Sequence, residues 1–164
     1  MDGFYVSAIN DKDDFSGFDC GTPDLNDFIR NDALTHQGKL LSKTYVCHRE
    51  VDDKPVAFYS VTMDSIKKQK VDDRDSFEIS NIPCYKIARL AVDREYQRKG
   101  IGETLLYDCV YHAKELSKQI GCRLVTVDSK PDAVDFYLKK QFKMTAKQQK
   151  QKYPTLYLDL ATIP

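Results

Sequence analysis

The sequence predicts a mixed α/β domain in which helices flank one central sheet. An apolar run from Tyr85 to Val92 has the composition of a central strand that is covered on both faces. A glycine-containing turn at 97–102 follows it, and a segment of helical periodicity begins at Gly100. Strand-like and helix-like segments then alternate to the end of the chain, which is typical of a layered α/β fold. At 164 residues, a single domain spanning 1–164 is expected.

The composition excludes several classes of protein. The 25 Lys and Arg residues balance 25 Asp and Glu residues, which argues against a surface coated in positive charge for nucleic acid. The five cysteines have no metal-binding or CxxC spacing, so we expect reduced, mostly buried thiols in a cytoplasmic protein. No apolar run approaches the roughly 20 residues of a membrane span, and no signal peptide is visible.

The N-terminal region is expected to contain a strand and a helix. Residues Tyr5–Ile9 form a short mixed run that suits a first strand. Thr22 and Pro23 are well placed as the N-cap and first residue of a helix. Apolar spacing extends that helix over 23–35, with a break before His36.

A hairpin and a loop are expected next. The runs Thr44–His48 and Val56–Met63 flank the charged turn Asp52-Asp53-Lys54, which predicts two antiparallel strands. The polar and charged segment 64–83 is expected to be a loop with some irregular structure.

The C-terminal half is expected to alternate between helix and strand. The amphipathic segment Gly100–Ile120 predicts a long helix that ends at Gly121. Residues Cys122–Val127 predict a strand, Asp132–Lys140 a short helix and Leu156–Leu160 a last strand.

The turn Gln97-Arg98-Lys99-Gly100-Ile101-Gly102 is the most informative stretch of the chain. A strand–turn–helix junction directs unpaired N–H groups and the positive end of a helix dipole at one place, which suits a phosphate or pyrophosphate. Glycines at such a junction can equally serve strand–helix packing. The third glycine of GxGxxG and the GKS/T of the Walker pattern are absent, which disfavours dinucleotides and nucleoside triphosphates.

Two motifs resemble those of the GNAT acetyltransferase superfamily. The stretch Leu90–Gly102 resembles its acyl-CoA-binding motif, (Q/R)xxGx(G/A) after a strand. The stretch Ala133–Phe142 resembles its AxxFYxxxGF segment, with Gln141 in place of the usual glycine. The common core covers roughly 43–163, and the resemblance implies a GNAT-like mixed central sheet flanked by helices.

The N-terminal stretch narrows the resemblance to one subgroup. Residues Phe18–Ile29, FDCGTPDLNDFI, resemble the opening of this subgroup. It includes toxins of bacterial toxin–antitoxin pairs, which acetylate the amino group of aminoacyl-tRNA, and many members of unknown substrate. The resemblance therefore implies the chemistry more closely than the acceptor.

The resemblance also implies a donor site for acetyl-CoA. Backbone amides of the turn would hold the CoA pyrophosphate, and the backbone of Leu90 and Val92, at a splayed strand edge, would bind the pantetheine arm. An amide there would polarise the acetyl carbonyl. The implied cofactor-binding residues are Leu90, Ala91, Val92, Gln97, Arg98, Lys99, Gly100, Ile101, Gly102, Glu103 and Thr104.

The second motif implies that Tyr137 is catalytic and protonates the departing CoA thiolate. A tyrosine phenol, whose ordinary pKa is near 10, stays protonated at pH 7 and can donate to a thiolate. Read without the motif, Phe136 and Tyr137 are equally well explained as adjacent core aromatics. Gln141 in place of glycine is expected to affect the helix exit without displacing Tyr137.

No general base is evident. The candidates are His36, His48, His112, Glu50 and a water held by backbone carbonyls. His112 reads as a packing residue beside the apolar stripe of its helix, and His48 as an exposed residue near a strand end. An α-amino group with a pKa near 8 keeps a useful neutral fraction at pH 7, so a dedicated base can be dispensable.

Arg89 is a candidate substrate-binding residue. It lies within an otherwise apolar strand, and a charge there must be paired or line a cleft. A salt bridge to a neighbouring acid and a contact with an anionic substrate or CoA both remain open.

Lysines gather in two loose clusters. Solvated surface is their ordinary explanation, whereas a tRNA substrate would give the second cluster phosphate contacts. The first cluster is Lys67, Lys68 and Lys70, and the second is Lys139, Lys140, Lys143, Lys147, Lys150 and Lys152.

The function that follows is transfer of an acetyl group from acetyl-CoA to a primary amine. Three dispersed histidines without HExxH predict no metal, and the absence of GxSxG favours direct transfer without a covalent enzyme intermediate. The acceptor is either the amino group of aminoacyl-tRNA or that of a small amine, peptide or protein lysine. A non-catalytic acyl-CoA-binding module is the third hypothesis. The resemblance also implies a ribbon–helix–helix antitoxin and a homodimer as partners.

Overall fold

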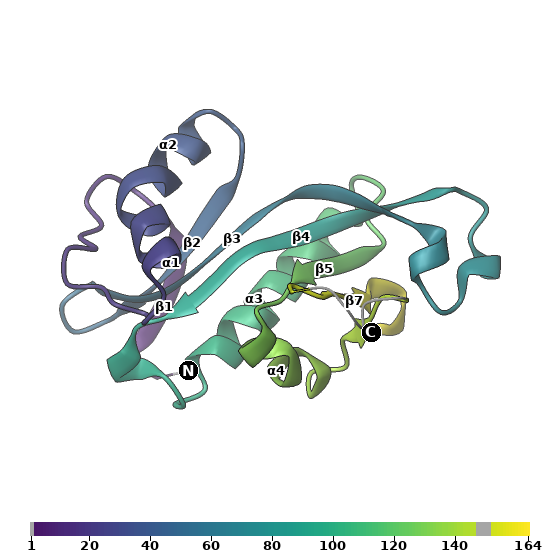
Figure 1. Cartoon of the computed structure of the whole chain (residues 1–164). Helices are drawn as coiled ribbons and strands as arrows, with labels where there is room; N and C mark the ends of the chain where they lie inside the picture. The colour runs from purple at the N-terminus through teal and green to yellow at the C-terminus, as the bar shows by residue number, and fades with distance from the viewer. Residues whose placement is uncertain (1, 147–151) are drawn as a thin grey trace. The chain divides into compact units, whose positions relative to one another are not determined.

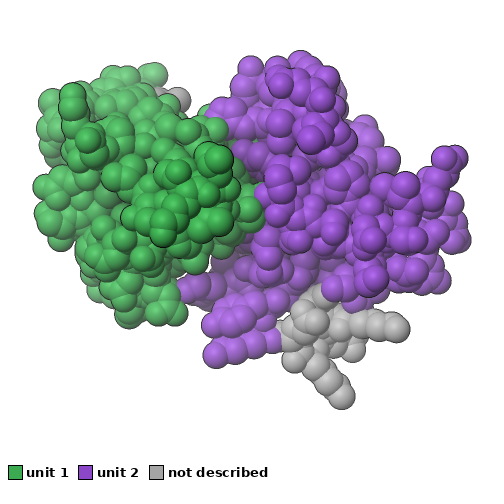
Figure 2. All heavy atoms as spheres, turned by 90° about the horizontal axis from the view of Figure 1, so that it is seen from above, with its two compact units in different colours: residues 1–62, 88–109 green, residues 63–87, 110–164 purple. Residues whose placement is uncertain are grey.

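The computed structural model describes residues 2–146 and 152–164 and confirms a mixed α/β fold (Figure 1). Within these residues, hydrogen bonds connect seven strands in the order β1-β2-β3-β4-β5-β7-β6. The chain divides into two compact units (Figure 2). Unit 1 comprises residues 1–62 and 88–109, and unit 2 comprises 63–87 and 110–164.

Unit 1 contains the predicted hairpin. β2 (Lys43–Arg49) pairs antiparallel with the first part of β3 (Lys54–Lys67), and β1 (Phe4–Ala8) pairs antiparallel with β2. Alternate residues of a strand point to opposite faces of the sheet, so each face of this hairpin receives its own layer.

The two faces of the β3 strand show these layers directly. The Phe58 ring lies 6.2 Å from the Phe28 ring, between centroids, on the side of the N-terminal helices. The next residue, Tyr59, donates a hydrogen bond of 2.6 Å to Asp108 of α3 (Ile101–Leu116). Unit 1 is therefore a three-layer arrangement of helix, sheet and helix. Its first core cluster consists of Ile9, Phe15, Phe18, Cys20, Phe28, Ile29, Ala33, Val46, Phe58 and Ala91.

The first helical segment is longer than predicted. It begins at Pro23, as expected, and runs through α1 (Pro23–Asp27), a π-helical turn (Phe28–Asp32) and α2 (Ala33–Gly38). The break predicted before His36 is wrong, because the His36 ring packs edge-on against the Phe28 ring at 5.6 Å and so belongs to the buried helix face.

Unit 2 is built on the remaining strands. The first part of β4 (Asn81–Val92) pairs in parallel with β5 (Leu124–Asp128). β7 (Thr155–Asp159) pairs antiparallel with β5 and with the short β6 (Lys143–Met144), which was not predicted. The core cluster of this unit consists of Ile66, Val71, Ile82, Cys84, Leu124 and Tyr157.

The loop predicted over 64–83 is only partly correct. β3 continues to Lys67 and β4 begins at Asn81, and the Lys68 amide donates to the Ser80 carbonyl at 3.0 Å between them. The polar residues of this extension are exposed, while Ile66 is buried. Two 3-10 turns, Lys68–Lys70 and Arg74–Ser76, form the irregular part.

The helix predicted to reach Gly121 ends at Leu116. The Ser117 hydroxyl donates to the Lys114 carbonyl at 2.6 Å, and this bond competes with continuation of the helix. The short helix near the C-terminus is confirmed as a 3-10 turn followed by α4 (Val134–Leu138). Within the described residues, no helix is long and apolar enough to cross a membrane.

Candidate active site

The turn after β4 has an unusual backbone. The Asp93 carboxylate accepts a hydrogen bond of 2.9 Å from the Glu95 amide and opens a 3-10 turn over Arg94–Tyr96. Arg98 and Gly100 then have φ angles of 62° and 84°. This left-handed conformation costs glycine little and other residues about 1–2 kcal/mol. The turn therefore depends on Gly100 and holds Arg98 in a strained conformation.

Helix α3 begins directly after this turn, and its first amides have no acceptor within the helix. Its first hydrogen bond runs from the Thr104 amide to the Gly100 carbonyl at 3.1 Å, and the Thr104 hydroxyl donates to the same carbonyl at 3.1 Å. The amides of Ile101, Gly102 and Glu103 precede that bond and have no acceptor within the helix. With a 16-residue helix behind them, they suit an anion such as a pyrophosphate.

The side chains of two residues of the predicted cofactor site are already hydrogen-bonded within the protein. The Gln97 side-chain amide donates to the Val92 carbonyl at 2.8 Å and to the Cys20 carbonyl at 3.1 Å. The Glu103 carboxylate accepts a hydrogen bond of 2.9 Å from the Tyr107 hydroxyl. Their contribution to an anion site would therefore come from the backbone, as the resemblance implies.

Tyr96, beside the turn, contacts three cations, one of which is the Lys54 ammonium at 5.7 Å from the centroid of its ring. The Lys99 ammonium lies 5.4 Å from the centroid of its ring, and the Arg49 guanidinium donates to its hydroxyl at 2.6 Å. Tyr96 as a whole is 9% exposed. Ile101, at 1% exposure, anchors the start of α3 in the core.

The strand before the turn continues past its pairing with β5. The parallel ladder ends where Ile87 lies opposite Val127, and β4 runs on to Val92. Ala91 points into the core, whereas Leu90 and Val92 are only partly buried. Leu90 and Val92 therefore lie beyond the part of β4 that pairs with β5.

Tyr137 lies on α4 and is 4% exposed. Its ring packs edge-on against Phe136, with 5.1 Å between centroids, and at a tilt against Phe142 at 5.5 Å. The Tyr137 ring is therefore a core aromatic, as the interpretation without the motif expected. This packing does not decide the role of the hydroxyl.

The residue that replaces the usual glycine closes α4. The Phe142 amide donates to the Tyr137 carbonyl at 3.2 Å, and the Gln141 amide donates to the Leu138 carbonyl at 3.3 Å. These two bonds, with the Phe142–Tyr137 contact, form a Schellman motif. Gln141 has a φ of 71°, the left-handed conformation that favours glycine at this position. The helix exit is thus kept with Gln141 in place of glycine.

Arg89 has a different partner from those considered in the sequence. Its guanidinium lies 3.7 Å from the centroid of the Phe28 ring, a close cation–π contact. Partial burial lowers the pKa of Arg89, and the charge of Asp32 opposes that shift. Arg89 therefore presents a positive charge that rests on an aromatic ring.

The structure argues against His48 as the general base. His48 is 2% exposed, so its predicted exposure is wrong. Its Nε2 lies 2.6 Å from Asp13, and its ring stacks on Tyr5 at 4.8 Å, whereas Nδ1 has no partner. A ring that is enclosed in this way cannot meet a substrate, so His48 is a structural residue.

The remaining candidate bases lie elsewhere. Glu50 is exposed at the end of β2, and His112 contacts Tyr111 at 5.9 Å on α3. His36 packs on the Phe28 ring. None of these contacts assigns a base.

The segments that carry the two basic clusters meet at one backbone hydrogen bond within unit 2. The Ala146 amide donates to the Lys70 carbonyl at 3.1 Å, which joins the segment of the second cluster to that of the first. Lys143 also lies 3.9 Å from Asp72, two residues after Lys70. Lys147 and Lys150 lie outside the described residues.

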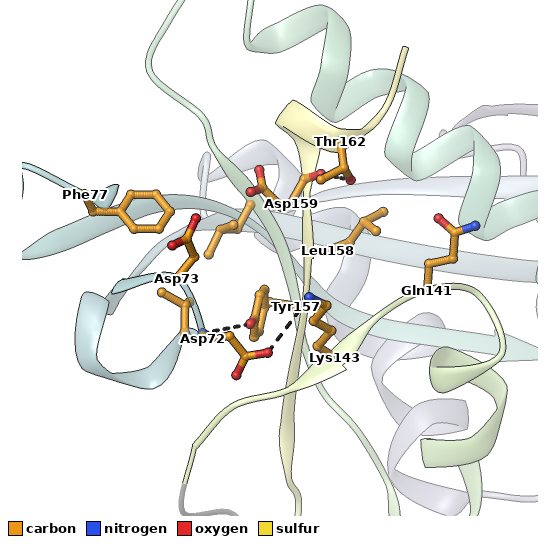
Figure 3. Close-up of a pocket in the computed structure, with 11 residues that line it drawn as sticks. Asp72, Asp73, Phe77, Gln141, Lys143, Tyr157, Leu158, Asp159 and Thr162 are labelled. Carbon is orange, nitrogen blue, oxygen red and sulfur yellow. Dashed lines mark hydrogen bonds and ion pairs between the residues drawn. The ribbon is translucent and has the colours of Figure 1, made fainter. Parts of the chain in front are cut away.

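A pocket of about 200 Å³ lies in unit 2 (Figure 3). Two of its acidic residues are already paired, since Arg123 donates to both oxygens of Asp159 at 2.6 and 3.0 Å and Lys143 lies 3.9 Å from Asp72. The Tyr157 hydroxyl accepts from the Asp72 amide at 3.1 Å. The pocket contains none of the predicted cofactor, substrate or catalytic residues, and we assign it no part in the reaction. Among the described residues, no group of His, Cys, Asp and Glu side chains is arranged to hold a metal ion.

Comparison with known proteins decides the family. The family described as the acetyltransferase (GNAT) domain matches residues 19–156. A tRNA-acetylating toxin of Mycobacterium tuberculosis is 31% identical over 139 residues, which cover 84% of this chain and 82% of the toxin. The chain belongs to the GNAT acetyltransferase family. It is an N-acetyltransferase, and the predicted enzyme class is confirmed.

Solved structures confirm the fold. A Tyr-to-Phe mutant of KacT has a TM-score of 0.90 at 20% identity, with 97% of this chain and 96% of that chain covered. AtaT complexed with acetyl-methionyl-tRNAfMet has a TM-score of 0.89 at 20% identity, with 98% and 96% covered. A mutant of AtaT bound to the C-terminus of the antitoxin AtaR and acetyl-CoA has a TM-score of 0.82 at 20% identity, with 98% and 95% covered.

Proposed function

We propose that this acetyltransferase moves the acetyl group of acetyl-CoA to the amino group of aminoacyl-tRNA. The observation that carries the proposal is the 31% identity, over 84% of the chain, with a tRNA-acetylating toxin. The fold shared with AtaT, which was solved in complex with acetyl-methionyl-tRNAfMet, supports it. Because β3, β4 and α3 each run through both units, we propose that 1–164 acts as one acetyltransferase domain.

The turn before α3 is the proposed donor site. The amides from Arg98 to Glu103 would hold the pyrophosphate of CoA, supported by the position of this turn at the start of the 16-residue helix α3. The Thr104 amide of the predicted set instead donates to the Gly100 carbonyl. The backbone of Leu90 and Val92 would bind the pantetheine arm, supported by the end of the β4–β5 ladder at Ile87. The structure of AtaT with acetyl-CoA supports acetyl-CoA as the co-substrate.

Tyr137 is the proposed general acid. The neutral amine nitrogen attacks the acetyl carbonyl carbon and forms a C–N bond, and the C–S bond to CoA then breaks. The leaving sulfur takes the phenolic proton of Tyr137, while the amine loses its extra proton to water. Solvent then returns a proton to the phenolate. The packing of the Tyr137 ring against Phe136 and Phe142 supports this role, because a fixed ring holds its hydroxyl in one orientation.

Arg89 is the proposed contact to an anionic part of the substrates. The Phe28 ring covers one face of its guanidinium, and a guanidinium donates through its edge in the plane of the group. The edge suits a phosphate oxygen, which accepts paired hydrogen bonds.

The lysines of unit 2 are the proposed contacts to the tRNA backbone. The link from Ala146 to Lys70 joins the two basic clusters into one region, whose exposed members include Lys67, Lys70 and Lys139. Phosphate contacts supply much of the affinity for a nucleic acid without reading its sequence.

The test is to incubate the protein with acetyl-CoA and bulk charged tRNA and to identify the aminoacyl ends by mass spectrometry. We expect N-acetylated aminoacyl ends that require both acetyl-CoA and charged tRNA. Uncharged tRNA with free amino acids serves as the control. Acetylation of amines or peptides without any acetylation of charged tRNA would contradict the proposal and favour the alternative acceptors.

A neutralising partner also belongs to the proposal. One AtaT structure carries the C-terminus of the antitoxin AtaR. We propose a cognate antitoxin of the ribbon–helix–helix type for this chain, and a homodimer as its assembly. Co-expression with the gene beside it, followed by purification and measurement of the complex mass, tests both.

A further inference from the structure

The N-terminal stretch Asp19–Asn26 is hydrogen-bonded to the strand and turn of the proposed donor site. The Asp19 amide donates to the Asp93 carboxylate at 3.0 Å, and the Arg94 amide donates to the Asp19 carbonyl at 2.9 Å. These two bonds run in opposite directions between the same short segments. They fix the stretch against the start of the turn, 74 residues away in sequence.

Asn26 fixes the conformation of this stretch. It is 9% exposed, and both ends of its side-chain amide are used. Its oxygen accepts from the Cys20 amide at 2.9 Å, and its nitrogen donates to the Asp19 carboxylate at 3.0 Å. The Gly21 amide donates to the same Asp19 oxygen at 2.9 Å. These bonds close a small ring that orients the Cys20 carbonyl.

Gln97 joins that carbonyl to the turn. Its side-chain nitrogen donates to Cys20 and to Val92, so one amide group links the N-terminal stretch, the end of β4 and the turn. The next residue, Arg98, has the strained left-handed conformation, and Gly100 follows it. A turn with two left-handed residues keeps one shape only if its start is fixed.

We propose that Asp19, Asn26 and Gln97 form a clamp that positions the donor-binding turn, and that its loss weakens binding of acetyl-CoA. These three are positioning residues, since they act through the turn amides. The inference rests on the proposed donor site. The clamp gives a role to the stretch Phe18–Asn26, which takes no direct part in the proposed reaction.

The sharpest test compares Gln97→Glu with Gln97→Arg. Glutamate has nearly the same size as glutamine but no N–H donor, and it places a carboxylate against two carbonyl oxygens. Arginine keeps N–H donors, and the acyl-CoA motif admits Gln or Arg at this position. We expect Gln97→Glu to raise the Kd for CoA and the KM for acetyl-CoA by about tenfold or more. Gln97→Arg should stay within about threefold of the unchanged protein.

Three results separate the clamp from a merely structural role. The loss in Gln97→Glu should fall mainly on Kd and KM, with a much smaller change in kcat at saturating acetyl-CoA. Gln97 is exposed, so its variants should unfold at the temperature of the unchanged protein within a few degrees. Equal CoA affinity in Gln97→Glu, or equal losses in Gln97→Glu and Gln97→Arg, would overturn the clamp.

A second pair of variants tests the ring of hydrogen bonds that Asn26 forms with Asp19 and Cys20. Asn26→Asp places two carboxylates against each other, and adding Asp19→Asn restores one donor between them. We expect the double variant to bind CoA more tightly than Asn26→Asp alone, and the absence of such rescue would contradict the role of the ring. If the unchanged protein binds no CoA, the proposed donor site fails. If it binds CoA and the clamp variants match it, only the clamp fails.

Discussion

At the residue scale, the backbone conformation of single residues shapes both parts of the proposed site. Gly100 has a φ of 84° just before α3, and Gln141 has a φ of 71° just after α4. Gly100 adopts this left-handed conformation at little cost, whereas Gln141 adopts it at a cost of about 1–2 kcal/mol in conformational free energy. The sequence motifs therefore reflect backbone geometry as well as chemistry.

Replacing Gly100 should weaken the donor site. A Cβ at Gly100 would meet nothing within 4 Å, so Gly100→Ala acts only through its left-handed φ. That conformation costs alanine about 1–2 kcal/mol, and the turn would leave it to relax. We expect the Kd for CoA, measured by calorimetry, to rise about tenfold.

The matched control for this variant is Gly17→Ala. A Cβ there also meets nothing within 4 Å, and its φ lies outside the left-handed region. Gly17→Ala should leave CoA affinity unchanged. An unchanged affinity in Gly100→Ala would mean that the turn conformation does not matter for binding.

At the scale of elements, the start of α3 and the end of α4 form the proposed donor-binding turn and hold the proposed acid. α3 begins with three amides that have no acceptor in the helix, and α4 ends in a Schellman motif. That motif places Phe142 against Tyr137 and closes the helix directly after the proposed acid. In this chain, the segment that resembles AxxFYxxxGF forms a short helix that carries Tyr137 and ends shortly after it.

Replacing Gln141 by glycine should stabilise the protein. Glycine at this helix-terminal position avoids the cost of the left-handed conformation, about 1 kcal/mol. We expect a rise of a few degrees in Tm, measured by thermal unfolding. Lys139→Gly, two residues earlier where φ is −67°, should instead lower Tm. A lower Tm for Gln141→Gly would contradict the reading of this turn.

The elements also show where sequence patterns suffice. The hairpin, β4 and the start of α3 follow from apolar periodicity and from the turn residues between them. The end of α3 at Leu116 goes with a single bond from the Ser117 hydroxyl to the Lys114 carbonyl, which no periodicity reveals. The π-helical turn at Phe28–Asp32 was likewise not predicted from the apolar spacing. The extension of β3 to Lys67 escapes prediction because its polar residues face solvent.

At the scale of the whole molecule, net neutrality hides an uneven distribution of charge. The 25 positive and 25 negative residues cancel. The lysines singled out for tRNA contact nevertheless all belong to unit 2. A nucleic acid responds to such a local concentration of charge and not to the total.

Binding of charged tRNA should therefore depend strongly on salt. We expect log K to fall linearly with log salt concentration, and Lys70→Ala and Lys139→Ala each to reduce the slope by about one. Lys12→Ala, an exposed lysine of unit 1, is the control and should leave the slope unchanged. Equal slopes for all three variants would remove the unit 2 lysines from the interface.

Only part of the candidate site could be predicted from the sequence. The turn and Tyr137 were predicted because each lies in a short contiguous motif. The clamp was not, because the Gln97–Cys20 bond joins residues 77 positions apart. The stacking of Arg89 on Phe28 is hidden for the same reason, since it joins a helical turn to a distant strand.

The most direct test of the mechanism is the single-turnover rate of acetyl transfer from prebound acetyl-CoA in Tyr137→Phe. Loss of a general acid should slow this step by about 100-fold or more, while the Kd for CoA stays unchanged. Tyr157→Phe, which removes the hydroxyl of another buried tyrosine of unit 2, is the control and should transfer at the normal rate. A Tyr137→Phe protein that transfers acetyl at the rate of the unchanged enzyme would contradict the account.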